Sequence, residues 1–151
     1  MSFAEILADA TAREDAGQDR VLIREGDVFV LAAAVAARTA TIRIGVAVDT
    51  ARTHPYVAAR KLAALDKISQ GRAEWLPEDA EPARRDEAVH LVEALLASWG
   101  PGATVNDRER GVHIDTDRIT AVHHDGRWWS VHSPLDVPAG PQGVVPRWAG
   151  P

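Results

Sequence analysis

Hydrophobic residues recur at helical spacing in four segments, and each segment begins with a residue that favours a helix start. The first follows the capping-box pair Ser2 and Glu5, and the second follows Asp27 and consists almost entirely of Ala, Val and Leu. Proline occupies the first turn of the other two, where its missing N–H costs no hydrogen bond. The pattern predicts helices at residues 3–15, 28–37, 55–70 and 82–99, with Val57 and Ile68 on the buried face of the third.

Short apolar runs between these helices predict strands. The run from Thr41 to Val48 is β-branched and apolar, and shorter runs lie at residues 21–23 and 73–76. Strands that alternate with helices favour a parallel sheet with right-handed crossovers. The pattern is equally typical of a small doubly wound sheet and of part of a (β/α) barrel. A full eight-stranded barrel needs about 250 residues, so only half of one would fit here.

The pattern becomes polar and irregular after the fourth helix. Residues 103–117 are predicted to form an excursion loop, and residues 119–122 and 128–131 flank Asp125-Gly126, which is a strong hairpin signal. A last strand is predicted at residues 144–148, although Pro146 removes a ladder donor and disfavours a central position. No domain boundary is evident, so we expect one domain spanning residues 1–151.

Charge and composition narrow the class of partner. The formal net charge is −5 and no cationic cluster is longer than Arg84-Arg85, which argues against nucleic acid and anionic membranes as partners. The chain has no cysteine, so disulfides and thiolate metal sites are excluded. No apolar run approaches the roughly 18 residues of a membrane span, and the N-terminal residues predict a helix and not a signal peptide. We therefore expect a cytoplasmic protein.

Catalytic and metal motifs give little guidance. His123, His124 and His132 occur close together, but there is no HExxH or His-x-His spacing, so we expect no metal. There is also no GxSxG, P-loop or GxGxxG motif. Motifs therefore identify no catalytic residue, and the catalytic set stays unknown.

The segment from Thr39 to Trp75 resembles the signature of the bacterial-luciferase-like flavin monooxygenases. That family shows His/Glu-Pro-Tyr, an Ala-Arg pair, Leu-Asp, Ser-Gly-Gly-Arg and a following Trp, in this order. The corresponding residues here are His54-Pro55-Tyr56, Ala59-Arg60, Leu65-Asp66, Ser69-Gln70-Gly71-Arg72 and Trp75.

The later part of the chain is similar to one branch of that family, the nitrilotriacetate and dibenzothiophene-sulfone monooxygenases. Members of this branch follow a helix ending in Trp with a loop, a hairpin of the form His-x-Gly-x-x-Phe-x-Val-x-Gly-Pro-Leu, then Pro-Gln-Gly and a strand ending in Ala-Gly. The matching segments here are residues 124–135, Pro141-Gln142-Gly143 and Ala149-Gly150. The resemblance covers roughly residues 20 to 150 and identifies the chain as a truncated member of the family.

The resemblance implies a fold and a chemistry. The fold class is α/β, a partial (half) TIM-type (β/α) barrel with parallel strands, crossover helices and an inserted β-hairpin. In relatives, reduced FMN from a separate flavin reductase reacts with O2 and a small organic substrate is oxidised. The cofactor lies at the C-terminal ends of the strands. The positions that the resemblance assigns to cofactor binding are Thr50, His54, Tyr56, Trp75, Ala149 and Gly150.

Several departures keep a second function open. Relatives follow the Trp with Asn and a Val-Thr-Ser run and have Arg-Tyr before the amphipathic helix, whereas this chain has residues 76–79 and Glu81-Pro82 there. Glu78, Asp79 and Glu81 are acidic, while a flavin phosphate needs cationic groups or backbone donors. The alternative is a non-catalytic remnant that serves as an oligomeric binding or interaction module. Under both hypotheses a half-barrel leaves open sheet edges and an exposed apolar face, so we expect a homo-oligomer.

The signature residues also have purely structural interpretations. Thr50 suits an ordinary strand end, and His54 suits a helix start. Asp66, Gly71 and Arg72 suit a turn and its ion pairs.

Overall fold

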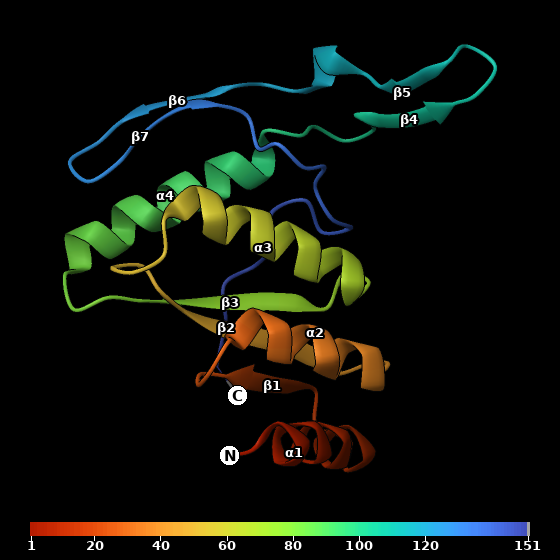
Figure 1. Cartoon of the computed structure of the whole chain (residues 1–151), viewed down its shortest axis with the longest axis vertical. Coiled ribbons are helices and arrows are strands. Elements are labelled where there is room, and N and C mark those ends of the chain that lie inside the picture. Colours follow the sequence, from red (N-terminus) through yellow and green to blue (C-terminus); the bar gives the residue numbers. More distant parts are fainter. Residues whose placement is uncertain (151) are drawn as a thin grey trace.

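The computed structural model describes residues 1–150, which form an α/β body and two small hairpins (Figure 1). The body contains, in chain order, α1 (Phe3–Asp15), β1 (Arg20–Ile23), α2 (Val28–Arg38), β2 (Arg43–Asp49), α3 (Pro55–Ile68), β3 (Ala73–Glu78) and α4 (Pro82–Ala97). The hairpins are β4 (Thr104–Asp107) with β5 (Val112–Ile114), and β6 (Val122–Asp125) with β7 (Ser130–Ser133); a short 3-10 helix, Thr116–Arg118, separates them.

The body is a parallel sheet in the order β1-β2-β3, and α2 and α3 are the crossovers. Leu22, Gly45 and Glu74 lie side by side across the three strands. The predicted parallel α/β arrangement is therefore confirmed. Hydrophobic residues from the sheet and the helices share one core, whose largest wholly buried side chains include Trp75, Ile44, Leu62, Leu91 and Leu95.

The four predicted helices all form, with the predicted starts. Ser2 and Glu5 make the capping box, and the Asp27 side chain accepts a hydrogen bond from the N–H of Val30. The predicted buried face of α3 is wrong at its two ends, because Val57 is 42% exposed and Ile68 is 51% exposed. The helix instead turns Ala59, Ala63 and Asp66 inward along with its leucines.

The last predicted strand is reduced to a single bridge. Arg147 pairs with Trp75 in parallel, the N–H of Trp75 donates to the Pro146 carbonyl at 3.1 Å, and the N–H of Trp148 donates to the Trp75 carbonyl at 2.8 Å. Pro146 has no N–H of its own, so the ladder beside β3 does not extend. Residues 145–148 still occupy the fourth position of the sheet.

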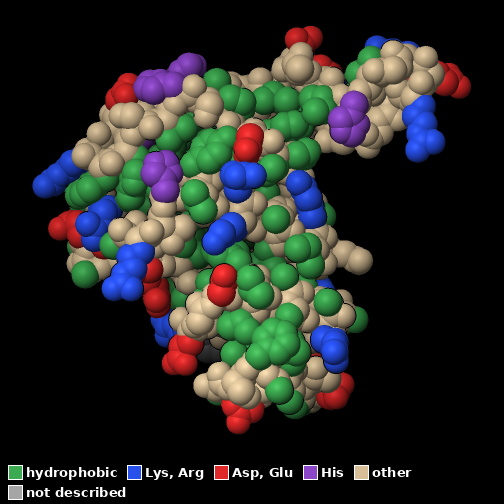
Figure 2. All heavy atoms as spheres, viewed as in Figure 1, with side chains coloured by type: hydrophobic (Ala, Val, Ile, Leu, Met, Phe, Trp, Pro, Cys, Tyr) green, Lys and Arg blue, Asp and Glu red, His purple; other side chains and the backbone are tan. Residues whose placement is uncertain are grey.

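The predicted excursion loop is wrong, since residues 104–114 form the β4–β5 hairpin. Its strands pair with a register irregularity, and Asn106 has a φ of 52°. The hairpin projects from the body as an arm (Figure 2). These strands are too short and too polar to show an alternating hydrophobic pattern, so the sequence alone did not predict them.

The second hairpin is confirmed, but its turn is displaced. Asp125 belongs to β6, and residues 126–129 form the turn, where the N–H of Gly126 donates to the Trp129 carbonyl at 2.9 Å. The Glu87 carboxylate accepts hydrogen bonds from the N–H groups of Arg127, Trp128 and Trp129. These donors are therefore not free for a strand ladder, and β7 begins only at Ser130.

No helix within residues 1–150 is both long enough and apolar enough to cross a membrane.

Candidate functional site

Polar side chains gather where the three parallel strands end. Arg24 follows β1, Thr50 follows β2, and Asp79 follows β3. Parallel α/β sheets bind their ligands at this C-terminal edge. The edge is therefore the candidate site.

Asp79 is the centre of this edge, and its side chain is 0% exposed. Its Oδ2 accepts hydrogen bonds from Thr50 Oγ1 and from Arg84 Nε, both at 2.8 Å. Its Oδ1 accepts from Arg84 Nη2 at 2.7 Å and from the N–H of Glu81 at 2.8 Å. The carboxylate thus joins β2, β3 and the first turn of α4. We call Asp79, Arg84 and Thr50 the clamp.

The clamp is a fixed ion pair at neutral pH. The hydrogen bonds from the Arg84 guanidinium hold the pKa of Asp79 well below its usual range. The same bonds raise the pKa of Arg84. Because one guanidinium contacts both oxygens of one carboxylate, the geometry is bidentate, which is the strong form of this pair.

The other cations at this edge also face carboxylates. Arg24 is paired with Glu78, and Arg52 Nε lies 3.5 Å from Asp49 Oδ2. A phosphate group needs cations or backbone donors that are free to contact it. The described residues of this edge therefore do not fit the phosphate of FMN. The acidic residues in the sequence pointed to the same misfit.

Three of the six predicted cofactor positions lie close to this edge. Thr50 is buried, and its hydroxyl is engaged by Asp79. His54 caps α3, with its Nδ1 accepting the N–H of Tyr56 at 3.1 Å, and its ring lies edge-on to Trp129 at 6.3 Å between centroids. The Tyr56 hydroxyl donates to the Pro134 carbonyl at 3.1 Å. The position of Thr50 after β2 and the capping role of His54 also agree with the purely structural interpretations of these two residues as a strand end and a helix start.

The structure does not bring the other three positions to the edge. Trp75 is wholly buried in the middle of β3, and its indole N–H has no hydrogen-bond partner among residues 1–150. Ala149 and Gly150 follow Trp148, which lies against Gly45, and Arg20 Nη1 at the start of β1 donates to the Gly150 carbonyl at 3.0 Å. The chain therefore turns away from Thr50 before it reaches Ala149.

Sequence reasoning missed the clamp and the role of Glu87. It took Asp79 only as a charge that repels phosphate, and it assigned no role to Arg84. The available signal was an Asp and an Arg five residues apart on either side of a helix start, a spacing that lets the arginine reach back past the first turn. Glu87 gives no local signal, because its partners lie about 40 residues further along the chain.

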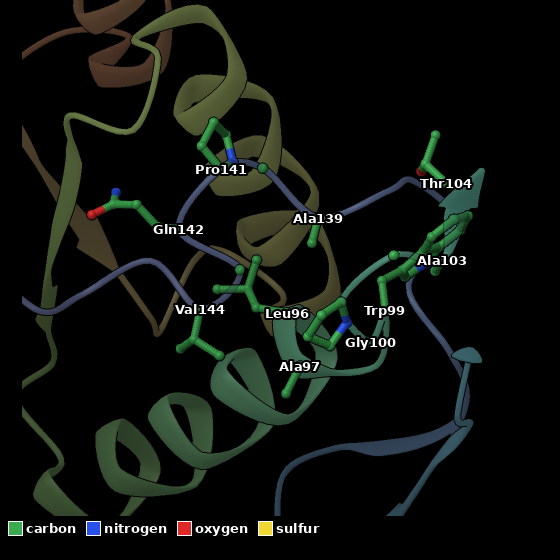
Figure 3. A pocket seen from close by; sticks show the side chains of 14 residues that line it. Leu96, Ala97, Trp99, Gly100, Ala103, Thr104, Ala139, Pro141, Gln142 and Val144 are labelled. Carbon is green, nitrogen blue, oxygen red and sulfur yellow. The ribbon is translucent and has the colours of Figure 1, made fainter. Parts of the chain in front are cut away.

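Two other candidate features lie outside the clamp. Histidines pair on and beside the β6–β7 hairpin, His123 with His132 and His90 with His124, but residues 1–150 contain no group of three or more ligands that could hold a metal. A cavity of about 560 Å³ lies between the C-terminal end of α4 and residues 139–144 (Figure 3). Along α4, Arg84 of the clamp and Leu96 of the cavity lining are 12 residues apart, about 18 Å.

Comparisons with known proteins agree with the resemblance seen in the motifs. The luciferase-like monooxygenase family matches residues 1–76, half of the chain. Dibenzothiophene-sulfone monooxygenase of Rhodococcus erythropolis is 33% identical over 84% of this chain and 32% of its own length. Nitrilotriacetate monooxygenase component A of Aminobacter aminovorans is 29% identical over 91% of this chain and 37% of its own length.

The crystal structure of DmoA from Hyphomicrobium sulfonivorans superposes with a TM-score of 0.86 at 20% identity, over 95% of this chain and 40% of that chain. Because the solved neighbours are luciferase-like (β/α)-barrel enzymes, this likeness confirms the predicted partial barrel. The chain spans about a third of the length of the curated relatives named above. With half of its residues matched by the family, the chain belongs to the luciferase-like monooxygenases.

Proposed function

We propose that this chain forms the clamp-bearing part of a luciferase-like, flavin-dependent monooxygenase that acts on a small organic substrate with O2. Family membership carries the proposal. The three parallel strands add support, since their C-terminal ends form an edge of the kind where such barrels bind ligands. The flavin would supply the redox chemistry, and the protein would position it and exclude water.

The proposed cofactor is FMN in its reduced form, delivered by a separate flavin reductase. The support is indirect: a relative is named as component A of nitrilotriacetate monooxygenase, and a diketocamphane monooxygenase of similar fold is described in complex with FMN. Thr50, His54 and Tyr56 are the proposed flavin contacts that lie near the strand edge. Trp75, Ala149 and Gly150 are proposed from the resemblance alone.

The first test is a flavin titration of the purified chain. Protein at high micromolar concentration is added to FMN and to riboflavin, and quenching of the flavin fluorescence is followed. The proposal expects quenching that saturates, and it expects oxygen consumption when a flavin reductase and NADH are added. Absence of quenching for both flavins would contradict it.

The alternative is a binding or interaction module that self-associates without catalysis. The observation that favours it is the apolar surface over α2 and α3, where hydrophobic side chains lie exposed between lysines and arginines (Figure 2). Val30 is 60% exposed in α2, and Val57 and Ile68 are exposed in α3. Such a surface promotes self-association. A homo-oligomer is proposed under both functions, and a monomeric mass in light scattering at micromolar concentration would contradict it.

A further inference from the structure

The clamp has the donor set of an oxyanion site. Arg84 presents two N–H groups to one carboxylate, Thr50 adds a hydroxyl and Glu81 adds a backbone N–H. A planar guanidinium with a hydroxyl and an amide is the combination that proteins use for phosphate and carboxylate ligands. Here the oxyanion is the side chain of Asp79, which belongs to the chain itself.

The position of the clamp indicates which ligand its donors would contact. It lies at the C-terminal ends of β2 and β3, on the edge where the proposed flavin would bind. The neighbouring cations are paired as well, Arg24 with Glu78 and Arg52 with Asp49. A ligand phosphate brought to this edge would have to displace a buried carboxylate that has four hydrogen bonds, and would meet Glu78 beside it.

We propose that Asp79 is a specificity-determining residue: its carboxylate fills the oxyanion position formed by Arg84, Thr50 and the Glu81 amide, and so keeps a ligand phosphate out. For flavins, this proposal means that the chain recognises the ring system and that the phosphate of FMN adds no binding affinity. This second statement rests on the proposed function, whereas the occupied oxyanion position does not.

The occupied position is tested with inorganic phosphate and the variant Asp79→Ala. Removing the carboxylate leaves Arg84, Thr50 and the Glu81 amide facing an empty space. Phosphate is expected to raise the melting temperature of Asp79→Ala by about 3 °C more than sodium chloride of equal ionic strength does. The double variant Asp79→Ala/Arg84→Gln is expected to lose this gain. Asp86→Ala is the matched control, because Asp86 is a neighbouring α4 carboxylate that is 73% exposed, so its removal changes the net charge equally.

Each result of this experiment decides the proposal. A folded Asp79→Ala protein without a phosphate-specific shift would overturn it, and so would an equal shift in the wild type. Asp79→Ala that does not fold in chloride is expected to regain its helical circular dichroism signal when phosphate or acetate is added, because the anion replaces the lost carboxylate. Absence of that rescue would also overturn the proposal.

The statement about flavins is tested by comparing FMN with riboflavin, which lacks the phosphate. The wild type is expected to bind the two within about twofold of each other, and Asp79→Ala is expected to prefer FMN by about tenfold, the value of one hydrogen-bonded charge. A wild type that prefers FMN tenfold would contradict the proposal. If no variant binds either flavin, the proposed function fails, and the phosphate experiment still decides whether Asp79 fills an oxyanion position.

Discussion

Asp66, which is wholly buried, and Gln142 join the two parts of the family signature through a pair of hydrogen bonds. Asp66 Oδ2 accepts the backbone N–H of Gln142 at 2.8 Å, and Oδ1 accepts the Gln142 side-chain amide at 2.7 Å. The same amide also donates to the Ala73 carbonyl at 2.8 Å. Gly140 has no room for a Cβ beside Asp66. The Leu-Asp motif of α3 therefore holds the Pro-Gln-Gly segment against the start of β3.

Asp66→Ala is expected to lower the free energy of unfolding by about 2–4 kcal/mol, because it removes a wholly buried carboxylate and leaves the backbone N–H of Gln142 and one N–H of its side-chain amide without their acceptor. Urea unfolding of Asp66→Ala, Gln142→Ala and the double variant measures the coupling of the pair, which is expected to exceed about 1 kcal/mol. Asp136→Ala is the control, since within the described part of the chain its carboxylate forms an ion pair only with Arg60, at the surface. Additive effects of the two substitutions would show that the pair does not act as one unit.

Glu87 is expected to hold the turn of the β6–β7 hairpin against α4. Glu87→Ala removes the acceptor of three backbone N–H groups and of the His124 ring, so hydrogen exchange at residues 127–129 is expected to accelerate at least about tenfold. The measurement is amide exchange by mass spectrometry or NMR. Glu93→Ala is the matched control on the same helix, because Glu93 forms an ion pair only with Arg147 as far as residues 1–150 are concerned. Equal protection of these amides in the two variants would refute the role of Glu87.

Glu14 is expected to make the stability of the protein sensitive to acid. Hydrogen bonds from the N–H groups of Thr41, Ile42 and Ala40 and from the Thr41 hydroxyl lower the pKa of Glu14 to about 2 from its ordinary 4.5. A group whose pKa is lower in the folded state stabilises the fold above its unfolded pKa, and this contribution disappears as the pH falls through the folded pKa. The Glu14 contribution is therefore complete above about pH 4.5 and is lost between pH 4.5 and 2.

Urea unfolding at several pH values tests this expectation with Glu14→Gln. The variant is expected to be less stable than the wild type at pH 7, and the difference is expected to shrink as the pH falls below 4.5. Glu109→Gln, in the projecting arm, is the matched control for the change in charge. A difference between wild type and Glu14→Gln that stays constant down to pH 2 would be inconsistent with the lowered pKa.

The parallel body was predictable because its helices and strands carry strong local patterns. Helix starts at Ser2, Asp27 and the two prolines follow from capping chemistry, and the strand at β2 follows from its β-branched run. The β4–β5 arm was missed because strands of four and three residues are too short to show a period. The family resemblance, and not the periodicity, identified the partial barrel.

The roles of the signature residues, and of Thr50 in the clamp, could not be assigned from spacing, because their partners are distant in the chain or depend on a precise turn. Asp66 and Arg72 were expected to stabilise a turn through ion pairs. Within residues 1–150, neither residue forms an ion pair. Arg72 instead donates to the carbonyls of Ala36, Thr39, Ile42 and Ser69, which ties the end of α2 to the start of β2. Such partners appear only when the whole fold is assembled.

Gly45 is expected to be required by Trp148. A Cβ at residue 45 would overlap Cε3 of the Trp148 ring and would lie 3.0 Å from Leu22, so Gly45→Ala must displace the indole from the sheet. The expected cost is about 1–3 kcal/mol of unfolding free energy, which is typical of overpacking. If the indole is the cause, Gly45→Ala is expected to cost much less in a Trp148→Ala background, where the ring is absent. Chemical denaturation of the four proteins measures this difference, and an equal cost in both backgrounds would mean that the strand itself, and not Trp148, excludes a side chain at residue 45.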